Sequence, residues 1–330
     1  MNQKTTLIHT HFHRRKTGLT RSVETVFPFF EDTYDSYIYG YGIDGRKITT
    51  RKLLKILFSK KETIVHCHRN NELMRMLFFR FLGGKFKLIA TRHAETTPSG
   101  LTKYLLKKAD TIITLTKSMS SNLGLPNTIV GHGVNIADFI PKENVSLPNI
   151  NQKNIISCVG RVRKAKGQKT LIKAISPILK NQKNWALIIV GKADKPAFLE
   201  ELKSIVKNYN LKNQIYFLGE TSEIISIYQA SHTVVVPSFT EGFSLVCAEA
   251  MACGCNIIAT KNVGVHSNLI TNKQNGYLFE AGNTEELQQN LQQIILEKKT
   301  HLGAEARKEI IQYWSAEKES KNLTEVYQSV

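Results

Sequence analysis

The sequence has 330 residues, 42% of them hydrophobic, and no apolar run of about 18 residues, so it predicts two globular domains and excludes a membrane-spanning helix. Its 45 Lys and Arg residues against 27 Asp and Glu give a net charge of +18, of which +12 falls in residues 1–150. This positive charge favours an anionic membrane surface or a phosphorylated glycolipid as a partner; the alternative is a basic surface that serves only solubility. Nucleic acid is excluded as a partner, because no zinc-finger or RNP pattern accompanies the charge.

Short apolar runs alternate with helical patterns through the first half of the chain. They predict strands over 5–12, 35–42, 63–68, 87–93, 111–116 and 127–134. Such alternation indicates a parallel sheet with helices on its faces. We therefore predict an N-terminal Rossmann-like domain over residues 1–140.

A second set of alternating elements follows a stretch rich in proline and asparagine, where we predict a linker at 141–154. Strands are expected over 155–161, 185–191, 215–219, 232–238 and 256–261. The fold class is thus α/β, with two doubly wound parallel sheets. The second domain is predicted over 155–312, and a C-terminal helix over 313–330 is predicted to pack back on the first.

The first candidate motif is VGRVRKAKGQKTL, which follows the strand at 155–161. Ligands of open α/β sheets bind beyond the carboxyl ends of the strands. Arg161 and Lys166 could there neutralise a diphosphate, although a solvated basic loop is the alternative. The chain has no G-x-x-x-x-G-K-[ST] motif, and no G-x-G-x-x-G follows a strand, which excludes a P-loop NTPase and a plain dinucleotide enzyme.

The second motif is PSFTEGFSLVCAEAMACG, which follows the strand at 232–238. Glu241 precedes a predicted helix and Glu249 lies within it. The helix start offers free N–H groups to a phosphate, and the two carboxylates could accept hydrogen bonds from sugar hydroxyls on either side. The alternative makes Glu241 a first-turn stabiliser of the helix and Glu249 a solvated helix residue.

The spacing of these residues resembles that of retaining GT-B glycosyltransferases of family 4. Four residues separate Arg161 from Lys166 and seven separate Glu241 from Glu249. The segments KTGLTRS, HGVNIADF and RHAETTPSGLT are also similar to that family, the last to its lipopolysaccharide-core mannosyltransferases. The resemblance implies two Rossmann-like domains facing across a cleft, with the acceptor bound by the first and a nucleotide sugar by the second.

The resemblance also implies roles for individual residues. Arg161 and Lys166 would bind the donor diphosphate and stabilise the charge that develops as the nucleotide leaves. Glu241 would hold hydroxyls of the donor sugar, and Glu249 those of the ribose. The remaining residues implied at the donor site are Gly18, Gly242, Phe243, Ser244 and Leu245.

In the N-terminal domain His93 takes the position of a family histidine that reaches toward the transferred sugar, and His132 is a weaker candidate to line the same site. The acceptor residues that the resemblance implies are Arg21, Arg92 and Glu95. His66 and His68 look like a metal pair, yet they alternate along a predicted strand and lack an evident third ligand. We predict no metal site, and because the chain has no D-x-D motif, the transfer is expected to be metal-independent.

The predicted function is the retaining transfer of a hexose, with GDP-mannose favoured over a UDP-sugar, to a lipid-linked glycan such as a lipopolysaccharide core. Five cysteines and the lack of a signal peptide predict a cytoplasmic protein, peripheral on the cytosolic face of the inner membrane. One alternative is a transferase that uses a UDP-sugar on another cell-envelope glycan. Others are a sugar-nucleotide epimerase, a phosphorylase, and a noncatalytic sugar-nucleotide binding protein.

Overall fold

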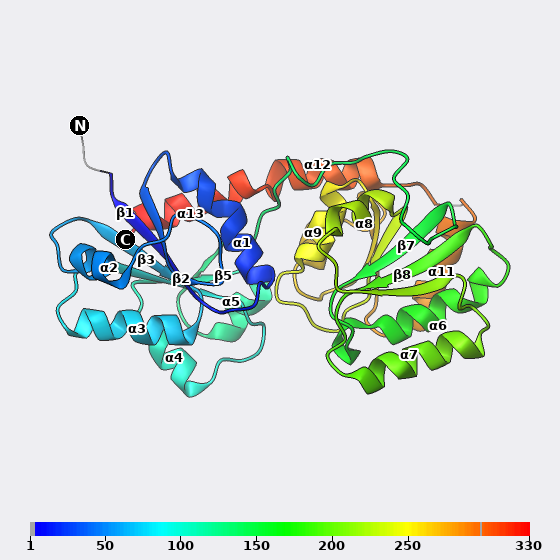
Figure 1. Ribbon diagram of the computed structural model, residues 1–330, viewed down its shortest axis with the longest axis horizontal. Coiled ribbons are helices and arrows are strands. Elements are labelled where there is room, and N and C mark those ends of the chain that lie inside the picture. Colours follow the sequence, from blue (N-terminus) through cyan, green and yellow to red (C-terminus); the bar gives the residue numbers. More distant parts are fainter. Residues whose placement is uncertain (1–3, 298) are drawn as a thin grey trace. The chain divides into compact units, whose positions relative to one another are not determined.

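The computed structural model describes residues 4–297 and 299–330 (Figure 1). The described chain divides into two compact units, one formed by the residues up to Asn135 together with Trp314–Val330, and the other by Ile136–Tyr313. Each unit contains one six-stranded sheet in which all neighbouring strands pair in parallel. The predicted α/β class with two parallel sheets is confirmed.

The sheet of the first unit has the strand order β2-β1-β3-β4-β5-β6. Its strands are β1 (Thr6–Phe12), β2 (Asp35–Tyr41), β3 (Thr63–Cys67), β4 (Lys87–Arg92), β5 (Thr111–Thr114) and β6 (Thr128–Ile129). Its helices are α1 (Gly18–Val26), η1 (Phe27–Phe30), α2 (Thr50–Leu57), α3 (Asn70–Phe81), α4 (Gly100–Leu106), α5 (Lys117–Leu123) and α13 (Ala316–Gln328). The predicted strand at 127–134 is thus only two residues long.

Both faces of this sheet are covered, as the alternation of side chains along the strands requires. Leu7 and Ile64 pack with residues of α13 on one face, whereas their neighbours Ile8 and Val65 pack in the cluster on the other. On the first face α13 buries Leu323, Val326 and Tyr327. Each such side chain contributes about 1.5–3 kcal/mol, so the C-terminal helix is fastened to this unit.

The sheet of the second unit has the strand order β12-β11-β10-β7-β8-β9. Its strands are β7 (Asn154–Val159), β8 (Trp185–Val190), β9 (Ile215–Gly219), β10 (Thr233–Val236), β11 (Asn256–Thr260) and β12 (Tyr277–Phe279). Its helices are η2 (Lys164–Lys166), α6 (Gln168–Leu179), α7 (Pro196–Asn208), α8 (Ile224–Ala230), α9 (Leu245–Ala252), α10 (His266–Leu269), α11 (Thr284–Ile295) and α12 (Gly303–Tyr313).

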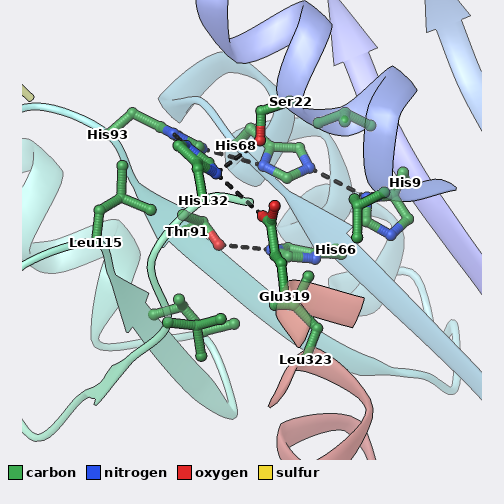
Figure 2. A pocket seen from close by; sticks show the side chains of 14 residues that line it. His9, Ser22, His66, His68, Thr91, His93, Leu115, His132, Glu319 and Leu323 are labelled. Carbon is green, nitrogen blue, oxygen red and sulfur yellow. Dashed lines mark hydrogen bonds and ion pairs between the residues drawn. The ribbon is translucent and has the colours of Figure 1, made fainter. Parts of the chain in front are cut away.

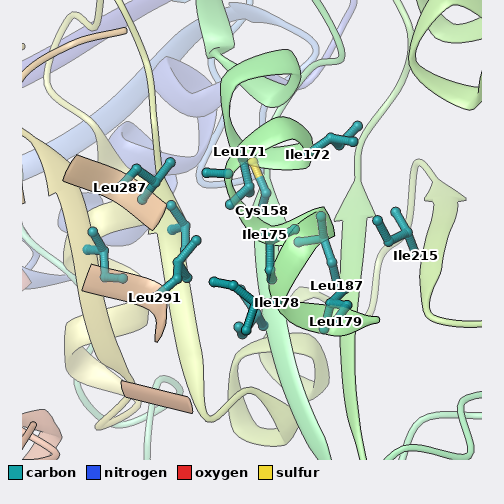
Figure 3. Packing of buried hydrophobic residues seen from close by; sticks show 14 of the residues in the cluster. Cys158, Leu171, Ile172, Ile175, Ile178, Leu179, Leu187, Ile215, Leu287 and Leu291 are labelled. Carbon is teal, nitrogen blue, oxygen red and sulfur yellow. The ribbon is translucent and has the colours of Figure 1, made fainter. Parts of the chain in front are cut away.

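The largest core lies on one face of this second sheet (Figure 3). Helix α6 turns Leu171, Ile175 and Leu179 inward at a spacing of four residues, which keeps them on one side of the helix. They pack in one cluster with Leu287 and Leu291 of α11. The rigid packing of α6 fixes the loop between β7 and this helix, where one of the sequence motifs lies.

The stretch 141–154, expected as a linker, falls within the second unit. There Leu147 is buried and packs with Ile155 of β7 and Ile188 of β8. Helix α12 holds the preceding residues, because Arg307 donates a hydrogen bond from Nη1 to the carbonyl of Phe139 at 2.8 Å. The polar composition that suggested a linker thus belongs to a segment anchored by a few apolar contacts.

Candidate functional site

The second sheet reverses its strand order between β7 and β10. Strands β8 and β9 follow β7 on one side, and β11 and β12 follow β10 on the other. Such a switch point is where open parallel sheets bind ligands, beyond the carboxyl ends of the two strands. The segment after β7 carries Arg161 and Lys166, and the segment after β10 carries Glu241. The topology therefore brings the two sequence motifs to the same edge.

Lys166 and Glu241 form an ion pair at this edge. The Lys166 ammonium lies 2.6 and 2.7 Å from the two carboxylate oxygens of Glu241, and Ser238 donates a hydrogen bond to Oε1 at 2.7 Å. The two charged side chains are only 16% and 9% exposed. A pair held by both oxygens in such surroundings is well ordered, so one cation and one carboxylate are presented together.

A close backbone approach makes this pair possible. Gly167 ends η2 with φ +69°, and a Cβ there would lie 1.9 Å from the carbonyl oxygen of Pro237 at the end of β10. Only glycine fits that approach, which draws the η2 turn against the segment that carries Glu241. Phe239 donates its backbone N–H to the carbonyl of Ala165 at 2.9 Å and fastens the same two segments.

The start of α9 lies next in the chain after Glu241. Ser244 adopts φ +88° and precedes the first helical residue, Leu245. Its hydroxyl lies 2.9 Å from Nε2 of His266, whose Nδ1 faces the carbonyl of Thr260 at 2.9 Å. Burial lowers the pKa of His266, so the neutral ring donates from Nδ1 and accepts from Ser244. Phe243 is 4% exposed, and its carbonyl accepts from Val265 at 3.2 Å.

Glu249 lies inside α9 and is 8% exposed, so the alternative that made it a solvated helix residue was wrong. The hydroxyl of Tyr228 donates to its Oε2 at 2.9 Å. Burial and this carboxylate raise the pKa of Tyr228 well above its ordinary value, which keeps the phenol protonated as a donor. Glu249 is thus an oriented, buried carboxylate on the helix that starts beside Glu241.

Arg161 pairs with a different carboxylate from the one that Lys166 contacts. Its side chain is 45% exposed, and Nη1 lies 3.4 Å from Oδ1 of Asp194. The amide of Gln168 donates to the Arg161 carbonyl at 2.9 Å and orients the turn. A nearby cavity of about 300 Å³ is lined by Lys164, Gly167, Lys169, Thr170, Lys173, Phe198, Glu201, Phe239 and Thr284, none of which is a predicted site residue.

Besides His93, four of the predicted site residues lie in the first unit, on α1, at the end of β4 and in the segment that follows β4. Gly18 is the first residue of α1, and Arg21 is exposed on the same helix. Arg92 ends β4 and donates from Nη2 to the carbonyl of Thr96, which turns the guanidinium onto its own loop. Glu95 accepts from the Ser118 hydroxyl at 3.4 Å.

Five histidines gather at the switch point of the first sheet, between β1 and β3 (Figure 2). The rings of His68 and His93 make the central contacts. Nε2 of His68 lies 3.3 Å from Nδ1 of His9, and Nδ1 of His68 lies 3.2 Å from Nε2 of His93. Nδ1 of His93 in turn lies 3.3 Å from Nε2 of His132. His66 joins through the hydroxyl of Tyr327. They line a cavity of about 20 Å³, which is the size of one water molecule.

The sequence argument against a third partner for His66 and His68 was wrong. Residues two apart in a strand point to the same face, so strand alternation does not separate the two rings. His68 directly follows β3, and the two ring centroids are 4.4 Å apart. His9 of β1 supplies a third imidazole, with one nitrogen of each ring within 4.8 Å of the others. The ring nitrogens of all three already have hydrogen-bond partners at 2.6–3.3 Å, which accounts for their burial without an ion.

Burial keeps the imidazoles of His9, His66, His68 and His93 neutral. It lowers the pKa of His9 to about 3 and lowers the pKa values of His66, His68 and His93 well below the ordinary range. Beside them Glu72 accepts from the Thr10 hydroxyl at 2.9 Å and from the backbone amide of His68 at 2.8 Å. Burial raises the pKa of Glu72.

Sequence reasoning missed three members of this cluster, namely His9, Glu319 and Tyr327. The recurrence of histidines in IHTHFH and VHCH, at the ends of two strands that become neighbours, was the available signal. Nothing in the local sequence of α13 marks Glu319 or Tyr327, because both reach the cluster only when the C-terminal helix packs on the first unit.

The two units with parallel six-stranded sheets give the chain the GT-B fold. The chain belongs to the family of glycosyl transferases group 1, which matches residues 140–314. The family resemblance predicted from the motif spacing is confirmed, and the protein is a glycosyltransferase.

Known proteins are similar over much or nearly all of the chain. Lipopolysaccharide core biosynthesis mannosyltransferase LpcC of Rhizobium leguminosarum bv. viciae is 27% identical over 98% of this chain and 96% of its own length. LpsB of Rhizobium meliloti, of the same description, is 32% identical over 62% of this chain and 61% of its own length. Anabaena Alr3699/HepE, solved in complex with UDP, has a TM-score of 0.83 at 17% identity, covering 99% of this chain and all of its own, and shares the fold.

Proposed function

We propose that this glycosyltransferase moves mannose from GDP-mannose to a lipid-linked glycan such as a lipopolysaccharide core, with retention of the anomeric configuration. The observation that carries the proposal is the ion pair of Lys166 and Glu241 at the switch point of the second sheet. The similarity to two lipopolysaccharide core mannosyltransferases supports the choice of sugar and acceptor.

In this proposal Lys166 binds the donor diphosphate while it orients Glu241, whose carboxylate accepts hydrogen bonds from hydroxyls of the hexose. Arg161, exposed and held at one nitrogen by Asp194, turns its remaining N–H groups to the diphosphate. Glu249 accepts from the ribose hydroxyls. The backbone amides of Gly242, Phe243, Ser244 and Leu245 bind phosphate oxygens at the start of α9.

In this proposal the cationic side chains of Arg161 and Lys166 replace the divalent metal of other transferases. They stabilise the charge that builds up on the departing diphosphate, and the departing phosphate takes the proton of the acceptor hydroxyl on the same face of the sugar. Gly18 at the start of α1 adds a phosphate contact. Arg21, Arg92 and Glu95 bind the acceptor glycan, and His93 contacts the transferred sugar.

A UDP-sugar donor is the second candidate, favoured by the likeness of the fold to a protein solved with UDP. Titration of the purified protein with GDP, UDP, ADP and CDP and their sugars, without metal, decides between them. We expect GDP and GDP-mannose to raise Tm selectively. In Arg161→Ala the affinity should fall about tenfold or more, because one charge-assisted contact to the diphosphate is lost. Selective binding of UDP would move the donor to the second candidate, and no binding would favour a noncatalytic protein.

We also propose that the protein acts at the cytosolic face of the inner membrane and contacts it through α3 and α4. Among the described residues no helix is long and apolar enough to cross a bilayer. Met74, Phe78 and Phe81 lie along one exposed side of α3, with Phe81 85% exposed, and α4 exposes Leu101 and Tyr104. Basic residues on and beside these helices include Arg75, Lys85, Lys87, Lys103, Lys107 and Lys108. An apolar stripe among cations fits an anionic lipid surface.

The double variant Phe78→Ser, Phe81→Ser tests this surface. We expect it to lower binding to vesicles that contain phosphatidylglycerol about tenfold or more, because two aromatic side chains no longer enter the interface. Flotation at low salt measures the bound fraction. Ile311→Ser on α12, which is 44% exposed in the wild type, is the matched control and should bind as the wild type does. Equal binding of the double variant and the control would contradict the assignment.

A further inference from the structure

A continuous series of hydrogen bonds runs through the first unit from α13 to β4, and Figure 2 labels all of its members except Tyr327. We call it the histidine chain, and its members in order are Glu319, His132, His93, His68, His9, Tyr327, His66 and Thr91. The successive donor–acceptor distances are 3.0, 3.3, 3.2, 3.3, 3.3, 2.7 and 2.6 Å. Every ring nitrogen of the five histidines has a partner in this series.

Each of these contacts holds one proton, because two lone pairs or two N–H groups cannot face each other at such distances. A neutral imidazole carries one proton on one of its two nitrogens. Once the proton is placed at either end of the series, the position of every other proton follows. The histidine chain therefore has two complete arrangements, and they run in opposite directions.

Glu319 selects between the two arrangements. Its Oε2 accepts the backbone N–H of Gly133 at 2.7 Å, and its Oε1 lies 3.0 Å from Nδ1 of His132. As a carboxylate it can only accept, so His132 must donate from Nδ1. Then His93, His68 and His9 also donate from Nδ1, Tyr327 donates to His9, and His66 donates from Nδ1 to the Tyr327 oxygen. The hydroxyl of Ser22, 2.6 Å from His132 Nδ1, fits either direction.

His93 is the member of the chain that can meet a substrate. The other four imidazoles are buried, with at most 8% of their surface exposed, whereas His93 is partly exposed at the end of β4. Both of its nitrogens are engaged, so a sugar hydroxyl must replace one partner. A hydroxyl that replaces His68 meets a lone pair on Nε2 in one arrangement and an N–H donor in the other.

We propose that Glu319 is a positioning residue for glycosyl transfer, because it orders the protons of the histidine chain and so makes Nε2 of His93 an acceptor for a sugar hydroxyl. The role of His93 in this inference rests on the proposed function. The proton order itself rests only on the contacts of the first unit.

Glu319→Gln tests the proton order directly. Gly133 still requires an acceptor, so the single oxygen of glutamine goes to its N–H and the amide NH₂ faces His132 Nδ1. We expect the whole chain to invert, with all five imidazoles changing from Nδ1–H to Nε2–H. Two-bond ¹H–¹⁵N correlation spectra of protein labelled with ¹⁵N-histidine report the tautomer of each ring. His11 and His266, whose Nδ1 faces a backbone carbonyl, should keep theirs and serve as internal references.

Two further variants control this experiment. Glu325→Gln removes an exposed carboxylate from the same helix and should leave every tautomer unchanged. Tyr327→Phe removes the hydroxyl between His9 and His66, so His132, His93 and His68 should keep their Nδ1 protons while His66 loses its coupling to them. A folded Glu319→Gln protein whose five rings keep their tautomers would overturn the proposal.

Enzyme kinetics provide a second test, which concerns the positioning role of Glu319. We expect Glu319→Gln to lower kcat about tenfold or more while the KM for the nucleotide sugar changes little, since Arg161, Lys166 and Glu249, which are proposed to bind the nucleotide, lie in the second unit. Inverted tautomers with unchanged kcat would overturn the positioning role. A wild-type protein inactive with every donor would contradict the proposed function instead, and the spectra would still decide whether Glu319 orders the chain.

Discussion

Glu241→Ala should lower kcat at least about 100-fold while the protein still binds the nucleoside diphosphate. The carboxylate is placed to hold the hexose, so its loss lets the sugar shift away from the reacting geometry. Lys166, freed from its partner at 2.6 Å, remains available to the diphosphate. Turnover and nucleotide affinity should therefore separate, which a general loss of structure would not produce.

The measurement pairs single-turnover kinetics with calorimetric titration of the diphosphate on the same preparation. Glu241→Gln keeps the size of the side chain and one acceptor oxygen, and should retain more turnover than alanine does. Glu280→Ala removes the carboxylate of the Lys261–Glu280 pair, at 3.1 Å but 51% and 60% exposed, and is the matched control. Unchanged turnover in Glu241→Ala would remove Glu241 from the site, and lost diphosphate binding would give it a structural role in holding Lys166.

The sequence predicted the two parallel sheets because each strand is a short apolar run followed by a helical pattern. It also identified Lys166 and Glu241 separately, each just after a strand. Their contact could not be predicted from spacing alone, since the two residues are 75 positions apart and meet only because β10 pairs with β7. The burial of Glu249 against Tyr228 likewise depends on packing between α8 and α9.

The histidine chain shows an error in the sequence reasoning. Strand alternation was applied to His66 and His68 as if it separated them, although residues two apart in a strand point to the same face. In the structure β3 ends at Cys67, and the backbone turns at His68. Its backbone N–H donates to the Glu72 carboxylate at 2.8 Å, which directs that turn. Glu72 therefore holds the backbone from which the His68 ring extends, whereas the period of two residues already places both rings on one side of the sheet.

The first unit should lose stability in mild acid before the second unit does. Burial lowers the pKa values of His9, His66, His68 and His93 in the folded state. The unfolded chain therefore binds more protons than the folded one below about pH 6.5, so stability is complete above that pH and falls as the pH is lowered. At pH 5.5 each such histidine lowers the free energy of unfolding by about 1.4 kcal/mol.

Together the four histidines lower the free energy of unfolding by a substantial share of the roughly 5–15 kcal/mol that is typical of a domain. The second unit has two described histidines with lowered pKa, His232 at about 4 and His266, and should resist longer. Glu72, whose pKa is raised, acts in the opposite direction above pH 4.5, where its ionised form disfavours the folded state.

Hydrogen exchange between pH 7.5 and 5, with labelling times corrected for the intrinsic rate, measures both units in one sample. Peptides from β1 and β3 should lose protection at a higher pH than peptides from β7 and β10. His66→Gln removes one titrating group, so its unfolding free energy should depend on pH less steeply by about 1.4 kcal/mol per unit, whatever its stability at neutral pH. Equal slopes for this variant and the wild type would mean that the ring is already protonated in the fold. The proton positions proposed for the histidine chain, from Glu319 to Thr91, would then be wrong.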